Sequence, residues 1–329
     1  MGGHWLRRRF EAAALLLLLA VIPSVATAAV VCAGTDPSRA TTLGERISAV
    51  ACRENALWYR PFINLHGQLA SMALSEAETG LLQDGATPAW KRVAEYWRGS
   101  GLLWGMNSFP GAAACARAVN ADFGSPDCRA FLIDRPWSAA FISFVLVRAG
   151  VPGFRPSARH IDYVRDAYLS PGSSPFLFAD PDIALPTAGD LLCYARGTTS
   201  FGYAGLQAWI AANPDAALAM HCEIVTRSAD AHTAYLIGGN VLQSVTLRML
   251  GLNRSGRFWN LPRGSDIGCS PGNQAVCNFN RHDWVVLLKL KPSLQAVPVT
   301  PIPGQPVEHG KCCVQCVVGA GIPRCPASH

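Results

Sequence analysis

Three residues between positions 138 and 240 are of types that together perform acyl transfer: Ser138, His221 and Asn240. Ser138 lies in the stretch RPWSAAFISFVLVRAG, where apolar residues recur at helical spacing and place the serine in the first turn. Unpaired N–H groups and the positive end of the helix dipole would stabilise a developing anion there. His221 could accept the hydroxyl proton, and Asn240 could orient the imidazole.

Each of these residues also has a purely structural interpretation. A serine at a helix start usually satisfies first-turn N–H groups. A histidine at a strand start can be a hydrogen-bonded core residue, and an asparagine after two glycines can simply form a turn. The sequence therefore leaves open whether the arrangement is a hydrolytic site or a structural one.

Trp137, His160 and Tyr163 are further candidates, as residues that contact a substrate. His160 could instead lie on the surface of a helix. No metal site of His160, His221 and Cys222 is expected, because the domain has no H-x-x-x-H and no paired C-x-x-C spacing. No cofactor is predicted. A reactive thiol at Cys222 is not expected, since it should point away from the direction of its strand neighbour His221.

The elements that must position these residues fall into two groups along the chain. Helical patterns predict helices over 42–59, 72–85, 87–101, 137–149 and 157–169, with Thr87 and Ser157 as start signals. Residues 105–134 are rich in glycine and alanine and predict loops. Strands are predicted over 189–195, 221–227, 233–241, 243–250 and 283–290. This order predicts an α+β domain, with N-terminal helices packed on a mostly antiparallel sheet of about five strands.

The N-terminus and the cysteines indicate export. Residues 1–28 combine Arg7–Arg9, an apolar run over 12–22 and small residues at 26–28, which predicts a signal peptide. An uncleaved anchor is the alternative; with cleavage, membrane contact is limited to this segment. All twelve cysteines follow it, and an even number is typical of exported, disulfide-bonded proteins. We expect a periplasmic or extracellular protein with the pairs Cys193–Cys222, Cys115–Cys128, Cys269–Cys277 and Cys32–Cys52.

The chain divides into three parts after the signal. Residues 29–291 form the α+β domain, and 292–308 carry five prolines and predict an extended linker. Residues 309–329 form a tail with Cys312, Cys313, Cys316 and Cys325. Export favours two disulfides over zinc there, because thiols do not stay reduced in an oxidising compartment.

Four motifs occur in an order shared with known families: WKRVAEYW (90–97), WSAAF (137–141), HCEIV (221–225) and IGGNV (237–241). They resemble the bacterial "domain of unknown function 2272" family, over roughly residues 42–291. With the GD turn at 189–190, the order is also similar to the papain-like NlpC and CHAP cell-wall amidases and endopeptidases. This resemblance implies a papain-like fold and a site at Ser138, His221 and Asn240.

The chain departs from the NlpC and CHAP pattern at two positions. Ser138 stands where those enzymes have a nucleophilic cysteine, and a hydroxyl is far less acidic than a thiol. Gly238 and Gly239 stand where some CHAP enzymes place a carboxylate before the asparagine. A neutral orienting residue supports a serine mechanism less well, because an imidazolium must form from neutral partners.

The resemblance implies an exported protein that acts on peptide or amide bonds of the cell wall. If the protein is a hydrolase, we expect a pocket that joins Ser138, His221 and Asn240. A non-catalytic cell-wall-binding protein predicts a similar cleft with Ser138 beyond reach of His221, and an envelope scaffold predicts a filled cleft. The expected partner is a cell-wall peptide or glycan-peptide. The mild net charge of +6 does not indicate a nucleic-acid partner, and the oligomeric state is left open.

Overall fold

The computed structural model describes Cys32 and residues 36–76, 80–118, 125–197, 199–226, 232–264 and 268–297. The expectations for the signal peptide, most of the linker and the Cys-rich tail lie outside these residues. In the described part, no single helix is long and apolar enough to cross a membrane. Only α5 and α6 (Pro126–Asp134 and Ser138–Ala149), bent by 100° at their junction, meet the length and composition criteria together.

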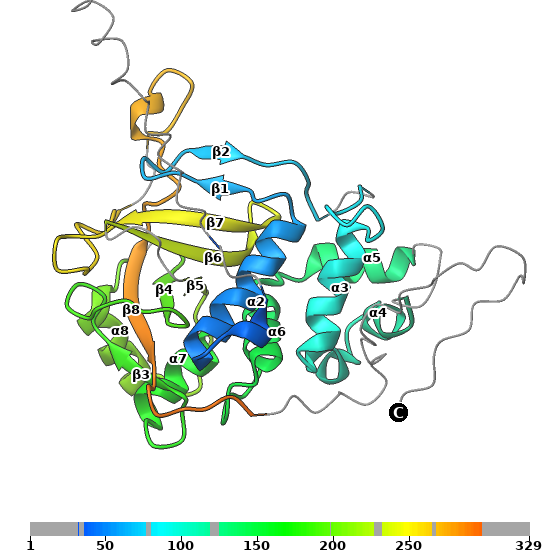
Figure 1. Ribbon diagram of the computed structural model, residues 1–329, viewed down its shortest axis with the longest axis horizontal. Coiled ribbons are helices and arrows are strands. Elements are labelled where there is room, and N and C mark those ends of the chain that lie inside the picture. Colours follow the sequence, from blue (N-terminus) through cyan, green and yellow to red (C-terminus); the bar gives the residue numbers. More distant parts are fainter. Residues whose placement is uncertain are drawn as a thin grey trace, which may run out of the picture. The chain divides into compact units, whose positions relative to one another are not determined.

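One mixed sheet of eight strands organises the described chain (Figure 1). Its order is β2-β1-β7-β6-β5-β4-β8-β3, and the neighbours pair antiparallel except β1 with β7. The strands are β1 Phe62–Ile63, β2 Leu69–Ser71, β3 Phe176–Ala179, β4 Leu191–Ala195, β5 Met220–Val225, β6 Thr233–Val241, β7 Ser244–Gly251 and β8 Asp283–Leu290.

The α+β prediction is confirmed, but the count of five strands is wrong. The five predicted strands are β4 to β8. The additional strands β1, β2 and β3 contain two to four residues each, too few for a period of two to be recognised in the sequence. They take their place in the sheet from pairing with distant strands, such as β3 with β8.

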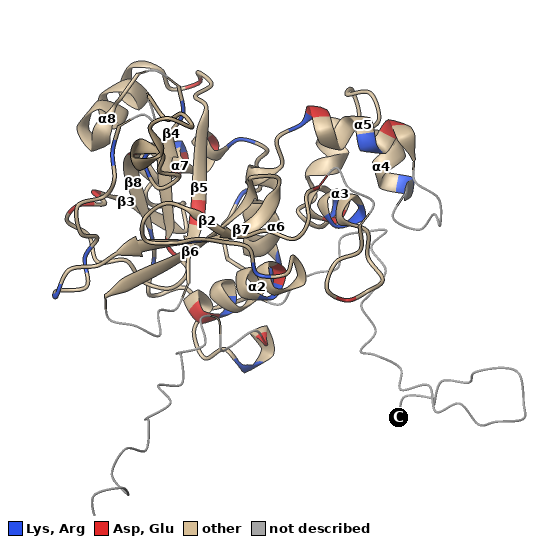
Figure 2. Ribbon diagram, turned by 90° about the horizontal axis from the view of Figure 1, so that it is seen from above, with Lys and Arg blue, Asp and Glu red and all other residues tan. Residues whose placement is uncertain are grey.

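Along the described chain, helices lie before the sheet strands and between them. They are α2 Leu43–Leu57, α3 Ala89–Gly99, α4 Ala112–Ala118, α5 Pro126–Asp134, α6 Ser138–Ala149, α7 His160–Leu169 and α8 Gly202–Ala212, with short 3₁₀ turns at Pro37–Arg39, Leu102–Met106 and Gln274–Val276. Residues of both charge signs are interspersed on α3 and α5 (Figure 2).

The predicted helix over 72–85 is absent from residues 72–76 and 80–85. Backbone N–H groups there donate to other parts of the chain, Glu76 to the carbonyl of Gln243 and Leu82 to that of Thr87. Leu74 and Leu82 still reach the core. The two leucines therefore anchor a loop to the core and do not mark one face of a helix.

The segment 105–134, predicted as loops, contains α4 and α5. Alanine is the strongest helix former, and the run over 112–118 uses it. Ser125 accepts a hydrogen bond from the N–H of Cys128 and caps α5, with Pro126 at its first position. The loop prediction, which was based on the glycine and alanine content, is therefore wrong for these two short helices.

The two predicted helix starts are displaced by a few residues. Thr87 donates its hydroxyl to Asp84 at 2.6 Å, and Pro88 occupies the N-cap of α3. Ser157 accepts from the N–H of Arg159 and donates to Asp162, so α7 begins at His160. This shift puts His160 at a helix N-terminus instead of one turn inside a helix.

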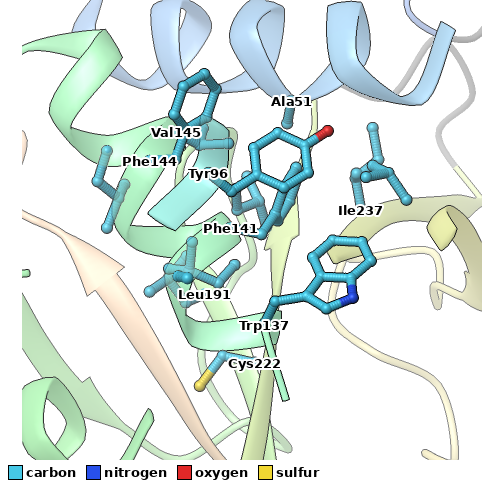
Figure 3. Close-up of a cluster of buried hydrophobic side chains, with 14 of the residues drawn as sticks. Ala51, Tyr96, Trp137, Phe141, Phe144, Val145, Leu191, Cys222 and Ile237 are labelled. Atoms are coloured by element: carbon cyan, nitrogen blue, oxygen red, sulfur yellow. The ribbon is translucent and has the colours of Figure 1, made fainter. Parts of the chain in front are cut away.

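Residues of the WKRVAEYW motif join α3 to α2. Arg92 and the hydroxyl of Tyr96 both donate to the buried carboxylate of Glu54, and Trp58 donates to Tyr96 at 2.9 Å. Figure 3 shows Tyr96 beside Phe141, beneath the α2 ribbon. The motif thus fixes α3 against α2, the two helices that pack on α6, and does not contribute to a site.

Strand alternation divides the core into two layers. On β5, Cys222 and Ile224 join the larger cluster with α2, α3 and α6, whereas Val225 joins a smaller cluster on the other face. His221 and Glu223 share the face of Val225 by the period of two. Cys222 therefore points away from His221, as expected.

All four predicted cysteine pairs are present as disulfides: Cys32–Cys52, Cys115–Cys128, Cys193–Cys222 and Cys269–Cys277. Cys193 and Cys222 lie directly opposite each other on β4 and β5. The described start of the linker is not free of the domain, since Val297 donates its N–H to the carbonyl of Gly150.

Candidate functional site

The proposed nucleophile is the first residue of α6. The N-cap is Trp137, and hydrogen bonding along the helix begins with the N–H of Phe141, which donates to the carbonyl of Trp137. The N–H groups of Ser138, Ala139 and Ala140 precede that bond and lie at the positive end of the helix dipole. The predicted placement of Ser138 in the first helical turn is therefore confirmed.

The hydroxyl of Ser138 pairs with His160, not with His221. Its Oγ lies 2.8 Å from Nε2 of His160, the first residue of α7. The other ring nitrogen, Nδ1, contacts the hydroxyl of Tyr163 one helical turn further on. With Nδ1–H donated to Tyr163, Nε2 is free to accept the serine proton.

Burial keeps His160 neutral. Ser138 is 5 % exposed, His160 4 % and Tyr163 3 %. Loss of solvation, and to a smaller extent the positive charge of Arg196, lower the pKa of His160 to about 3. At neutral pH the imidazole is therefore unprotonated, and its free lone pair can accept a hydrogen bond from the serine hydroxyl.

His221 lies beside this chain of contacts but is bonded elsewhere. Its ring centroid is 5.2 Å from that of His160. Its Nδ1 accepts from Nη2 of Arg196 at 3.2 Å, because a guanidinium can only donate. Burial, then the repulsion that His221 and His160 would exert on each other if both were protonated, then the charge of Arg196, hold the pKa of His221 well below its usual value.

The second ring nitrogen of His221 faces the carboxylate of Glu223, which is already bonded to an arginine. Nε2 is 3.6 Å from Oε1 of Glu223 and has no hydrogen-bond partner among the described residues. Glu223 instead accepts from Arg248 through Nε and Nη2, at 2.9 to 3.0 Å. Both members of this ion pair are at most 2 % exposed.

Asn240 does not orient either histidine. The ring contacts of His160 and His221 go to Ser138, Tyr163 and Arg196, as described above. Asn240 has φ +56° and lies where the pairing of β6 with β7 shifts register. Asparagine tolerates the left-handed region, so the turn interpretation accounts for its place.

The two glycines before Asn240 allow close approach between elements of the site. A Cβ on Gly239 would lie 2.4 Å from Cβ of Phe141 on α6. A Cβ on Gly238 would lie 2.9 Å from Glu223 and 3.0 Å from Nε2 of His221. The IGGNV motif therefore lets β6 pack directly against α6 and the His221 side chain.

Trp137 belongs to the core rather than to an open substrate surface. It is fully buried, and its ring stacks 5.5 Å from Tyr96 and 5.9 Å from Trp58. Figure 3 shows Trp137 and Tyr96 within the same cluster of buried side chains. This stacking fixes the entry to α6 and hence the direction of Ser138. We do not retain the prediction that Trp137 contacts a substrate.

The family model described as "Uncharacterized protein conserved in bacteria (DUF2272)" matches residues 84–290. The chain belongs to this family. No curated protein and no solved structure matches the chain. All four motifs of this DUF2272 protein lie inside the matched range, so the family region contains Ser138, His160 and His221.

Three residues of the DUF2272 site were missed by the sequence analysis: Arg196, Glu223 and Arg248. Glu223 could have been found, because it is two positions from His221 and must share its face of the strand. Arg196 and Arg248 had no local signal, since their partners lie on other strands. The described residues contain no group of three His, Cys, Asp or Glu side chains arranged to hold a metal ion.

Proposed function

We propose that this protein is an exported cell-envelope hydrolase of peptide or amide bonds, with Ser138 as nucleophile and His160 as its general base. The supporting observation is the 2.8 Å contact between Ser138 Oγ and His160 Nε2, with Tyr163 on the far ring nitrogen. This is the geometry by which a weakly acidic hydroxyl is activated. The papain-like assignment rests on the motif order, and export is supported by the four disulfides.

The proposed reaction is acyl transfer in two steps. Oγ of Ser138 attacks the carbonyl carbon while its proton moves to Nε2 of His160, and the N–H groups at the start of α6 stabilise the oxyanion. The leaving amine takes the proton from His160, and an acyl-serine remains. Water, deprotonated by His160, then attacks the acyl carbon; the bond to Oγ breaks, the acid leaves, and His160 returns the proton to Oγ of Ser138. Because Ser138 is 5 % exposed, the side chains that cover it must move before substrate reaches it.

Turnover of purified peptidoglycan, followed as newly released amino groups, tests this proposal. We expect Ser138→Ala and His160→Ala each to remove most activity and Ser138→Cys to preserve or raise it, because a thiolate suits a helix N-terminus beside a histidine. His221→Ala should retain more activity than His160→Ala. Ser143→Ala, which alters another buried serine of α6, is the matched control. Full activity in Ser138→Ala would refute the mechanism.

A second candidate is a non-catalytic cell-wall-binding protein on the same fold. The burial of Ser138 and the complete burial of His221 favour it. It predicts that the wild type binds peptidoglycan without turnover. Gain of amidase activity in Ser138→Cys alone would then identify a former cysteine-hydrolase site that now binds ligand.

A further inference from the structure

Arg196 connects the buried histidines to the surface. It directly follows β4 and is exposed, whereas its neighbours Tyr194 and His221 are buried. Nη2 donates to Nδ1 of His221 at 3.2 Å, and the guanidinium carbon lies 6.0 Å from the centre of the Tyr194 ring. The guanidinium is therefore held on its inner side and faces solvent on its outer side.

The charge of Arg196 is not neutralised by an ion pair in the described part of the chain. The acid beside its partner His221 and the acid opposite its neighbour Ala195 are both bonded elsewhere. Glu223 is bound by Arg248. Asp283, opposite Ala195 on β8, accepts from the N–H groups of Phe201 and Gly202. By contrast, the Arg92 and Arg98 side chains each pair with a glutamate.

Arg196 also influences the reacting groups electrostatically. Its charge contributes to the lowered pKa of both His160 and His221. An anion that approached Arg196 would therefore lie within electrostatic range of the Ser138–His160 pair. A guanidinium presents two parallel N–H groups to a carboxylate, a fit that lysine lacks.

We infer that Arg196 is the docking residue for a substrate carboxylate, so that the hydrolase takes peptides with a free carboxylate close to the scissile bond. The inference rests on the proposed function for the place of the scissile bond at Ser138. It rests independently on the exposed guanidinium held by His221 and on the commitment of Glu223 and Asp283 to other partners. Arg196 is thus a specificity residue rather than a catalytic one.

Binding to the Ser138→Ala protein tests this inference without relying on turnover. The probes are the peptide Ala–D-Glu–Lys–D-Ala with free carboxyl groups and the same peptide with every carboxyl group converted to carboxamide. We expect calorimetry to show at least about tenfold tighter binding of the free acid, the size of a charge-assisted bidentate contact. Adding Arg196→Ala should abolish this preference, and Arg196→Lys should restore part of it. Arg155→Ala, at an exposed arginine already paired with Asp166, is the control and should keep the preference.

A spectroscopic readout separates docking from a structural role. Arg196→Ala should shift the ¹⁵N signal of His221 Nδ1, and free-acid peptide should shift that signal only when Arg196 is present. Equal affinity for both peptides, or binding of neither, would overturn the inference even if the wild type cleaves peptidoglycan. An Arg196-dependent preference in a protein that cleaves nothing would support the inference and refute the hydrolase.

Discussion

Ser138 and His160, the first residues of α6 and α7, meet through their side chains at 2.8 Å. Two helix N-termini therefore converge on one hydrogen bond. The contact places a hydroxyl beside a buried, neutral imidazole. It also replaces the expected pairing of Ser138 with a histidine from the sheet.

Tyr163→Phe should slow peptidoglycan hydrolysis while leaving Ser138 and His160 in place. Its hydroxyl is the partner of Nδ1 of His160, so its loss frees the ring to adopt the unproductive tautomer. We expect kcat to fall about 10- to 100-fold, less than for loss of the base itself. Tyr168→Phe, on the same helix, is the control, and an unchanged kcat in Tyr163→Phe would show that Tyr163 does not orient the base.

Stability should rise with pH between about 3 and 6.5. Burial lowers the pKa of His160 and His282 to about 3 and that of His221 well below its usual value. As the pH falls below 6.5, these histidines bind protons in the unfolded chain but stay neutral in the folded protein. The free energy of unfolding therefore falls. Each histidine contributes a slope of up to about 1.4 kcal/mol per pH unit. Urea titrations across this range measure it, and His160→Gln should reduce the slope.

Gly239→Ala should destabilise the protein, because its Cβ would lie 2.4 Å from Cβ of Phe141 and two elements must separate to admit it. We expect a loss of about 1–3 kcal/mol, typical of overpacking. Gly205→Ala in α8 meets only an ordinary 3.5 Å contact and should be neutral or stabilising. Equal unfolding midpoints for the two variants would contradict the close packing of β6 on α6.

Removal of the Cys193–Cys222 disulfide by a double alanine substitution should cost about 3–4 kcal/mol, as expected from the entropy of a loop of this length. The bridge closes a separation of 29 residues and joins β4 to β5 next to His221. The Cys269–Cys277 bridge closes 8 residues in an exposed segment, so its removal should cost less. Thermal unfolding of both variants, compared with the wild type, decides the order.

Glu223→Gln should be among the most destabilising single substitutions. It removes the charge that compensates Arg248, which is 2 % exposed, and a buried unpaired charge costs about 3–5 kcal/mol. Asp166→Asn removes an acid from the exposed pair with Arg155 and should cost less than about 1 kcal/mol. Similar chemical denaturation midpoints for both variants would mean that Arg248 finds another partner.

The elements that depend on local pattern were determined by the sequence. The helix from Ser138 and the strands β4 to β8 follow from apolar spacing, which each segment carries within itself. The disulfide between Cys193 and Cys222 follows as well, because both segments were predicted as strands that should be adjacent. The motif order identified the family, and the family model matches residues 84–290, a later start than the predicted 42.

The choice of partner for Ser138 was decided by the tertiary structure. From the sequence, we expect His221 to be that partner and His160 only to contact a substrate, because the local sequence around a histidine does not give its distance from α6. The start of α7 at His160 and the bond from Arg196 to His221 are set by contacts between elements far apart in the chain. Side-chain type and spacing therefore determined which residues could react, and the packing of α6, α7 and β5 decided which of them meet.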